Sequence, residues 1–254
     1  MSAKNTLTFH VVTLFPEVVE AYASSSILGR AREKGLIDVR YYNPRDFVVP
    51  SKKAKKDADG KVVPAELTYE DRRVDGRPYG GGPGMVIEAL PVIKAIDKAV
   101  GKKVRAAASA KKSAASKVKI IFFSPSGSQF TNDAAESFKK YTDIVFVCGR
   151  YEGIDARVKK AFPMTDISVG PFVLTGGEVP AMIIIDSVTR RIPGVLGHHS
   201  SVEENRDGVA SPDVYTRPET IEFKKKTYRV PKVLLSGDHA KMEAWKKEKI
   251  EKNR

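Results

Sequence analysis

The chain has 254 residues, a mass of 27.9 kDa and 41% hydrophobic residues, a globular composition that argues against a disordered protein. Its apolar runs are far shorter than the roughly 20 residues of a membrane span, and its start lacks a signal-peptide core, so we expect a cytoplasmic protein. The net charge of +13 favours a polyanionic partner, either nucleic acid or an anionic membrane surface. The single cysteine, Cys148, excludes an intramolecular disulfide and a cysteine-based zinc site, and we interpret it as a small core residue.

Strand and helix signals alternate in the first part of the chain. In order, we predict a strand over Leu7–Thr13, a helix after Phe15-Pro16-Glu17, a helix capped within Ser24-Ser25-Ser26 and ending at Gly35, and a strand over Ile37–Tyr42. Residues 43–84 are polar and punctuated by glycine and proline. This stretch is too long for an idle connection, so we predict that it is functional. A helix with Pro91 near its start follows and reaches Val100.

The second part opens with a basic insert of alanine, serine and lysine over residues 101–117, which we expect to be flexible. Strands over Lys119–Phe123 and Ile144–Cys148 flank a helix over Asn132–Tyr141, the pattern of a parallel α/β unit. Another helix follows Glu178, with Pro180 in its first turn. A polar linker over residues 197–212 then leads to a last helix, which we expect Ser236 to cap.

Three glycine-containing segments follow predicted strands, whereas the common phosphate-loop, zinc-protease and dinucleotide-binding motifs are absent. The segments are Ser124-Pro125-Ser126-Gly127-Ser128, Gly149-Arg150-Tyr151-Glu152-Gly153 and the run from Ser168 to Glu178. Ligands of open α/β sheets bind outside the carboxyl ends of strands, where glycines let the backbone approach closely. The three segments therefore predict one small-molecule site, with backbone groups against a purine ring and Glu152 or Glu178 offering charge to a cation. The alternative is three ordinary turns.

Longer motifs add a family resemblance. The central ones are Cys148-Gly149-Arg150-Tyr151-Glu152-Gly153-Ile154-Asp155, Val169-Gly170, Leu174-Thr175-Gly176-Gly177-Glu178-Val179-Pro180-Ala181 and Ile192-Pro193-Gly194-Val195-Leu196-Gly197. Others are Thr13-Leu14-Phe15-Pro16-Glu17, Arg77-Pro78-Tyr79-Gly80-Gly81-Gly82-Pro83-Gly84-Met85, Tyr215-Thr216-Arg217-Pro218-Glu219 and Leu234-Leu235-Ser236-Gly237-Asp238-His239. In this order, across nearly the whole chain, they resemble the bacterial tRNA (guanine-N(1))-methyltransferase family.

The resemblance implies an α/β fold: a parallel sheet with helices on both faces and a C-terminal trefoil knot, plus a short C-terminal helical extension. It divides the chain into a catalytic domain over residues 1–196 that binds S-adenosylmethionine, a linker over 197–212, and an RNA-contacting segment over 213–254. It implies tRNA as partner, no membrane, and a homodimer with its active site at the subunit interface. The target is the guanine immediately 3′ of the anticodon, and magnesium is associated with activity.

The resemblance also implies the residues of the site. The methyl donor lies bent against Ser124, Pro125, Gly149, Tyr151, Glu152, Val169, Gly170, Pro171, Phe172, Val173, Leu174, Gly176 and Gly177. Pro171-Phe172 stands where the family often has Asp-Tyr, which preserves backbone contacts but not side-chain contacts. The Gly80-Gly81-Gly82 loop with Arg77 and Tyr79 suits an RNA phosphate and a stacked base, the alternative being a flexible turn.

Methylation of the guanine ring nitrogen needs a carboxylate to take its proton and a cation to stabilise the developing negative charge. By resemblance Arg190 is the cation. The base is an aspartate in the family, but counting from Gly197 reaches Asn205, and counting back from Tyr215 reaches Glu203. We predict Glu204 as the base, with Glu203 and Asp207 as alternatives.

Two other functions remain open: a non-catalytic RNA-binding relative, which Asn205 allows, and a knotted methyltransferase of another RNA such as ribosomal RNA. The basic insert is predicted to contact tRNA phosphates through Lys102, Lys103, Lys111 and Lys112. The alternative for the insert is a solvated loop.

Overall fold

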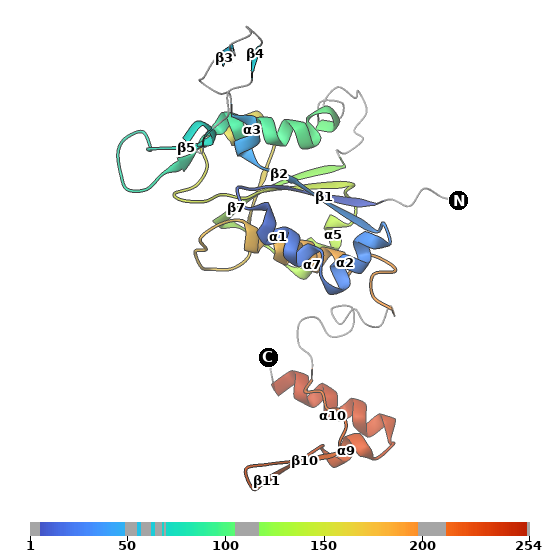
Figure 1. Ribbon diagram of the computed structural model, residues 1–254. Coiled ribbons are helices and arrows are strands. Elements are labelled where there is room, and N and C mark those ends of the chain that lie inside the picture. Colours follow the sequence, from blue (N-terminus) through green and yellow to red (C-terminus); the bar gives the residue numbers. More distant parts are fainter. Residues whose placement is uncertain are drawn as a thin grey trace, which may run out of the picture. The chain divides into compact units, whose positions relative to one another are not determined.

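The computed structural model describes residues 6–48, 55–56, 62–63, 68, 70–104, 117–197 and 212–252 (Figure 1). The chain divides into two compact units, Met1–Gly197 and His198–Arg254, and each is described by itself. Within the described ranges, every helix is too short or too polar to span a bilayer.

A five-stranded sheet forms the centre of the first unit, in the order β2-β1-β8-β7-β9 with every neighbouring pair parallel. The strands are β1 (Leu7–Val12), β2 (Ile37–Tyr42), β7 (Val118–Gln129), β8 (Asp143–Val147) and β9 (Thr165–Ser168). Parallel neighbours need crossover connections, which the helices of this unit supply. The predicted α/β class with a parallel sheet is confirmed.

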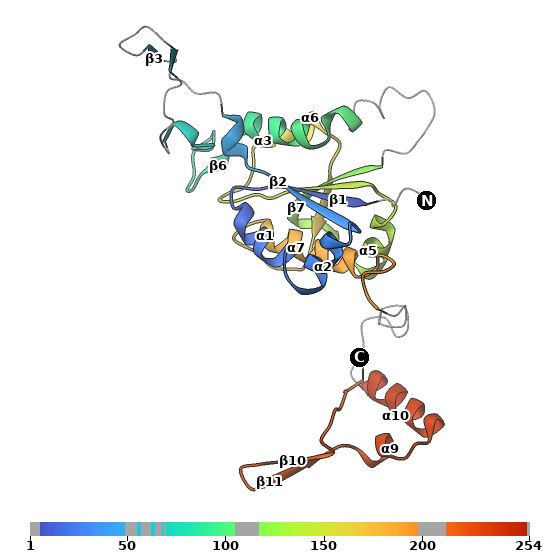
Figure 2. The ribbon, with the colours of Figure 1, turned by 45° about the vertical axis from the view of Figure 1, so that its right-hand side comes forward.

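Helices lie on both sides of this sheet (Figures 1 and 2). One side carries α1 (Pro16–Ala23), α2 (Ser26–Glu33), α5 (Asn132–Phe138) and α7 (Glu178–Thr189). The other carries α3 (Ala89–Ile96), the π-helical turn η3 (Asp97–Gly101), the 3-10 turn η1 (Pro44–Phe47) and α6 (Val158–Ala161). The helix predicted to reach Val100 thus passes into a π-helical turn, and residues 102–104 that follow are also helical.

The strands are apolar on both faces because both faces are covered. Ile144 and Phe146 of β8 pack into the core beneath α1, α2 and α7, whereas Val145 and Val147 pack into the core beneath α3 and α6. Phe146 stacks on Phe9 of β1, with ring centroids 5.9 Å apart. Successive side chains of the strand therefore pack into two separate cores, one on each face of the sheet, as expected of a buried parallel sheet.

The strand predicted to end at Phe123 continues, with an interruption. Phe123 and Ser128 both pair with Ile167 of β9, which leaves residues 124–127 outside the ladder. The strand-end position predicted for the first glycine-containing segment is therefore wrong in detail. The segment is a bulge inside β7, because the strand resumes its pairing with β9 at Ser128.

The long polar stretch after β2 contains short elements of secondary structure. They are the antiparallel pairs β3 (Lys55–Lys56) with β4 (Val62–Val63) and β5 (Asp75–Gly76) with β6 (Val86–Ile87), and the 3-10 turn η2 (Glu70–Arg72). This stretch connects β2 to α3.

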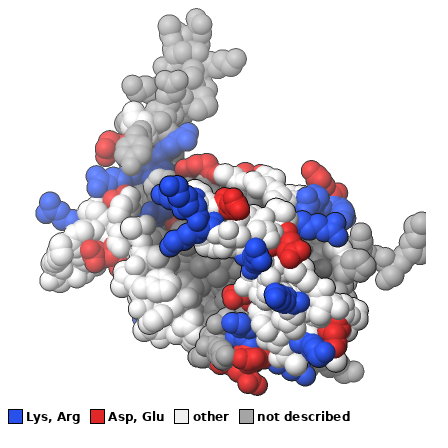
Figure 3. All heavy atoms as spheres, turned by 90° about the horizontal axis from the view of Figure 1, so that it is seen from below, with Lys and Arg blue, Asp and Glu red and all other residues white. Residues whose placement is uncertain are grey.

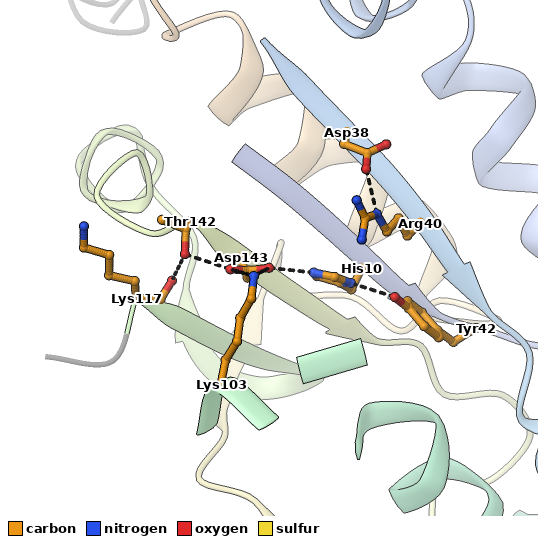
Figure 4. A network of polar contacts seen from close by, with 8 residues as sticks. All are labelled: His10, Asp38, Arg40, Tyr42, Lys103, Lys117, Thr142 and Asp143. Atoms are coloured by element: carbon orange, nitrogen blue, oxygen red, sulfur yellow. Dashed lines mark hydrogen bonds and ion pairs between the residues drawn. The ribbon is translucent and has the colours of Figure 1, made fainter. Parts of the chain in front are cut away.

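A polar network lies at the amino end of β8, opposite the edge where the strands end (Figure 4). Asp143 is 1% exposed; its Oδ1 accepts a hydrogen bond from Nε2 of His10 at 2.9 Å, and both its oxygens bind Nζ of Lys103 at 2.6 and 2.7 Å. Burial by itself raises the pKa of Asp143, but the hydrogen bonds from His10, Lys103 and Thr142 hold it well below its usual value. Lys103 lies near the start of the basic insert, two residues before the undescribed residues 105–116.

The second unit contains a hairpin of β10 (Thr220–Phe223) and β11 (Lys226–Arg229), then α9 (Lys232–Leu235) and α10 (His239–Lys252). The predicted C-terminal helical extension therefore also contains a two-stranded hairpin, which was not predicted. The cap predicted for the last helix is wrong. Oδ1 of Asp238 accepts from the backbone N–H of Lys241 at 3.1 Å, the usual N-cap bond, whereas Ser236 accepts from Asp238.

Candidate functional site

A cavity of about 310 Å³ opens at the carboxyl ends of the central strands. Its walls come from the bulge in β7, the segment after β8 and the segment after β9. The lining residues are Phe122, Phe123, Ser124, Pro125, Gly149, Arg150, Tyr151, Glu152, Gly153, Ile167, Ser168, Val169, Gly170, Phe172, Val173, Leu174, Thr175, Gly176, Gly177 and Pro180. The three glycine-containing segments thus converge on one hollow.

Backbone contacts join the segments after β8 and β9. Arg150 and Gly176 form an antiparallel bridge, and the N–H of Gly177 donates to the carbonyl oxygen of Gly149 at 3.0 Å. Gly177 has to lack a side chain because a Cβ there would lie 2.6 Å from the Cα of Cys148. The two segments therefore form one continuous wall.

A buried ion pair supports this wall. Glu178 is 1% exposed, accepts a hydrogen bond from the Thr13 hydroxyl at 2.6 Å, and lies 3.0 Å from Nη2 of Arg150. The Arg150 guanidinium lies 4.6 Å from the centre of the Phe15 ring, a cation–π contact. Glu178 and Glu152 were the two carboxylates predicted to offer charge to a cationic ligand. Arg150 already neutralises Glu178. Glu152 lines the cavity, whereas Glu178 is not among the lining residues.

Twelve of the thirteen residues predicted to contact the methyl donor line the cavity. Pro171 does not; it is exposed and lies between two lining residues. Tyr151 has a φ of 59°, a left-handed conformation that non-glycine residues rarely adopt and that recurs at ligand sites. Sequence reasoning did not select Arg150, although it lies inside a motif; the buried partner, Glu178, identifies its role only in the folded chain.

The residues predicted to contact RNA near the site lie outside the cavity lining. Arg77 is exposed, Tyr79 is 100% exposed, and the following Gly80, Gly81 and Gly82 all have positive φ. Their segment joins the wall after β8, because the N–H of Glu152 donates to the Met85 carbonyl at 3.0 Å.

Arg190 lies far from the cavity within one chain. It follows the last residue of α7, whereas the cavity borders the first turn of the helix. Twelve helical residues rise about 18 Å. The chain therefore does not bring its own Arg190 to its own cavity.

The predicted bases Glu203, Glu204 and Asp207, together with Asn205, lie outside the described residues. Cys148 is buried at the end of β8, and burial raises the pKa of its thiol, consistent with a core residue. Among the described residues, no cluster of three or more His, Cys, Asp or Glu is arranged to hold a metal ion.

A parallel sheet whose carboxyl edge carries such a cavity is the architecture of α/β proteins that bind nucleotide-like ligands. A family model described as tRNA (Guanine-1)-methyltransferase TrmD matches residues 7–254. The chain belongs to this family.

Individual relatives agree with the family assignment. The chain is 38% identical over 248 residues to a tRNA (guanine-N(1)-)-methyltransferase of Pseudoalteromonas translucida (strain TAC 125), covering 97% of this chain and 84% of the relative. It is 40% identical over 239 residues to the enzyme of that name from Yersinia pestis (strain Pestoides F), covering 93% and 83%. The fold is similar to the crystal structure of tRNA (m1G37) methyltransferase from Aquifex aeolicus, with a TM-score of 0.67 and 32% identity, covering 94% of this chain and 87% of that one.

Proposed function

We propose that this chain transfers a methyl group from S-adenosylmethionine to N1 of the guanine immediately 3′ of the anticodon in tRNA. The observation that carries the proposal is the cavity formed by the three family motifs, in a chain that matches the family over residues 7–254. A tRNA-modifying activity also fits the cytoplasm.

S-adenosylmethionine would supply an electrophilic methyl group on a sulfonium sulfur. The volume of the cavity suits it, because small-molecule sites span about 300–1,000 Å³. Backbone N–H and carbonyl groups of the glycine-containing walls would bind the adenine. Glu152, the carboxylate among the lining residues, would face the cationic end of the donor.

A trefoil knot is supported by the way the chain returns after β9. β9 lies beside β7 at the edge of the sheet, yet the segment that follows β9 comes back to the end of β8, where Gly177 bonds to Gly149. Threading of this segment through the preceding loops would form the knot, a rare exception to the rule that chains avoid such crossings.

A homodimer with the site at its interface is supported by two observations. Val18 and Tyr22 of α1 and Val179 and Ile183 of α7 are 40–46% exposed, which gives these two contacting helices an uncovered apolar surface. The length of α7 keeps Arg190 away from the cavity of its own chain. A second copy packed on these helices would bring its own Arg190 to the cavity.

In the reaction, a carboxylate of this chain accepts the N1 proton of guanine. The N1 lone pair takes the methyl carbon, and the bond between carbon and sulfur breaks with both electrons left on sulfur. Arg190 stabilises the negative charge that develops on the guanine carbonyl oxygen. Glu204 is our candidate for the base, with Glu203 and Asp207 as alternatives.

Magnesium is usually held in proteins by one or two carboxylates together with several waters. Glu152 is the carboxylate among the residues that line the cavity, and the described residues contain no cluster of three or more His, Cys, Asp or Glu. The association of magnesium with activity stays a prediction.

Single variants identify the base. Glu204→Gln is expected to lower methyl transfer by roughly 100-fold or more with donor binding retained, within the usual range for general base catalysis. Full activity of Glu204→Gln together with inactivity of Glu203→Gln or Asp207→Asn would reassign the base. Donor and RNA binding by the parent chain without any methyl transfer would identify the non-catalytic relative.

Complementation between two inactive variants tests the shared site. Gly176→Val should block donor binding, because a side chain there meets Arg150 and Glu178. Arg190→Ala should keep donor binding and lower methyl transfer by roughly 100-fold or more. Dissociating and reassociating the mixed chains would restore an intact site in each mixed dimer, up to about a quarter of all sites. No recovery, with mixed dimers demonstrated, would mean that each site uses a single chain.

The positive charge fits an RNA partner. On the face drawn in Figure 3, lysine and arginine side chains lie in several groups with acidic side chains between them. We therefore expect tRNA to be held by separate basic segments, including residues 213–254.

A further inference from the structure

The hairpin of β10 and β11 projects from the rest of the second unit (Figures 1 and 2). All eight residues of its strands are exposed. They include large side chains: Ile221 is 53% exposed, Phe223 61% and Tyr228 49%. A two-stranded hairpin is marginally stable alone, and gathered exposed aromatic rings indicate a surface for a partner.

The pairing register gathers these rings on one face. Ile221 pairs with Tyr228, and Phe223 pairs with Lys226. Residues two apart share a face of a strand, so these four residues lie on the same side, here called the aromatic face. The aromatic face contains no acidic residue. The opposite face carries Thr220, Glu222, Thr227 and Arg229.

The turn beside the aromatic face is strongly basic. Lys224 and Lys225 have φ values of 47° and 63°, and Lys226 follows them as the first residue of β11. The ammonium of Lys224 lies 5.3 Å from the centre of the Phe223 ring. Three adjacent cations next to two exposed rings combine charge for phosphates with flat surfaces for bases.

A hollow of about 520 Å³ lies at the base of the hairpin. It is lined by Tyr215, Thr216, Arg217, Glu219, Val230, Leu234 and Leu235. The backbone of Val230, the residue after β11, bonds to Glu219 before β10, so the hollow is tied to both ends of the hairpin.

We propose that the aromatic face stacks on unpaired nucleobases of tRNA while Lys224, Lys225 and Lys226 contact the adjoining phosphates. Unpaired bases are the RNA groups that aromatic side chains stack on, because paired bases are covered by their neighbours. The three lysines favour a polyanion over a protein partner. This inference rests on the proposed function only in taking tRNA as the RNA.

The test is binding of the full-length chain to a tRNA transcript in the absence of S-adenosylmethionine, so that failed methyl transfer and failed hairpin binding are distinguishable. Phe223→Ala with Tyr228→Ala should weaken binding by about 5- to 150-fold for each base unstacked. Tyr228→Phe keeps the ring and should bind like the parent chain. Thr227→Ala, on the opposite face, is the matched control and should also bind like the parent.

Salt titration of RNA binding separates the contribution of the lysine charges from that of base stacking. Replacing Lys224, Lys225 and Lys226 by alanine should flatten the plot of log affinity against log salt by somewhat under one unit for each phosphate that is no longer neutralised. The aromatic double variant should lower affinity and leave that slope unchanged. A single-stranded oligoribonucleotide should compete with tRNA for the parent chain better than a fully paired duplex of equal charge.

Two results would overturn the proposal. One is unchanged tRNA affinity in the aromatic double variant with donor binding intact. The other is a change in the oligomeric state of that variant, measured by sedimentation, without a change in RNA affinity, which would assign the aromatic face to contact between copies of the chain.

Discussion

Replacing Gly177 by alanine tests whether close contact between two loops shapes the cavity. The added Cβ would lie 2.6 Å from the Cα and 3.0 Å from the Cβ of Cys148, where carbon atoms normally stay about 3.5–4.0 Å apart. The φ of −86° at Gly177 suits alanine, so backbone strain does not contribute. Because Cys148 follows a fully buried strand, the loop that carries Gly177 has to move, by about 1 Å.

The contacts of Gly177 determine how much the substitution should lower stability and donor affinity. Overpacking of this kind costs about 1–3 kcal/mol of unfolding free energy. The same shift lengthens the 3.0 Å hydrogen bond between Gly177 and Gly149 and displaces the wall that faces the ligand. Removal of one or two hydrogen bonds to the donor, at about 1 kcal/mol each, raises its Kd by roughly 5- to 30-fold.

Calorimetric titration with S-adenosylmethionine and unfolding in urea measure the two effects. Gly149→Ala is the matched control, because it borders the same cavity but its Cβ would meet only the side chain of Ile154, at 3.4 Å. Gly197→Ala controls for the effect of a glycine-to-alanine change by itself, because a Cβ added there would have no atom within 4 Å. Unchanged donor affinity and stability in Gly177→Ala would refute the loop-packing argument. Equal decreases in Gly149→Ala and Gly177→Ala would point to direct contact with the donor instead.

Three further predictions concern residues away from the cavity. Arg190→Ala should lower methyl transfer by roughly 100-fold or more and leave donor affinity unchanged, as single-turnover kinetics and calorimetry would measure; an equal decrease in donor affinity would contradict it. Asp143→Asn should lower the unfolding free energy at pH 7 by about 1–3 kcal/mol. Because folding lowers the pKa of Asp143, the deficit should be full above about pH 4 and shrink as pH falls below it; urea titrations showing the same deficit at pH 7 and pH 3 would exclude this linkage. Replacing Lys102, Lys111 and Lys112 by alanine should flatten the plot of log tRNA affinity against log salt. Lys103 is left unchanged in this variant because it pairs with Asp143. An unchanged slope of that plot would mean that the basic insert is a solvated loop.

Elements with strong local signals were predictable from the sequence. The strand at Ile37–Tyr42 is observed with the predicted bounds, and α2 begins at Ser26 and is followed by Gly35 with a φ of 64°. Apolar runs and end signals of this kind depend on neighbouring residues alone.

Other features depend on contacts between distant residues. The hairpin turn uses Lys224 and Lys225 where sequence rules expect asparagine and glycine, so β10 and β11 were missed. The bulge in β7 arises from its pairing with β9, more than thirty residues later. Pairing of Lys103 with Asp143 joins positions forty residues apart, which local patterns do not contain.

The candidate site was predictable as a set of motifs but not as a geometry. The sequence grouped the loops that line the cavity, because all carry glycine near a strand. It did not indicate that Glu178 is neutralised by Arg150, which is a tertiary contact. Nor did the assignment of Arg190 by resemblance indicate that a whole helix separates this residue from the cavity.

Methyl transfer to a defined tRNA tests the central claim most directly. The substrate is an unmodified tRNA transcript with guanine immediately 3′ of the anticodon, and the control is the same transcript with adenine at that position. With labelled S-adenosylmethionine, we expect methylation of the first transcript alone, at N1 of that guanine. No transfer to the first transcript, or equal transfer to both, would contradict the proposed function.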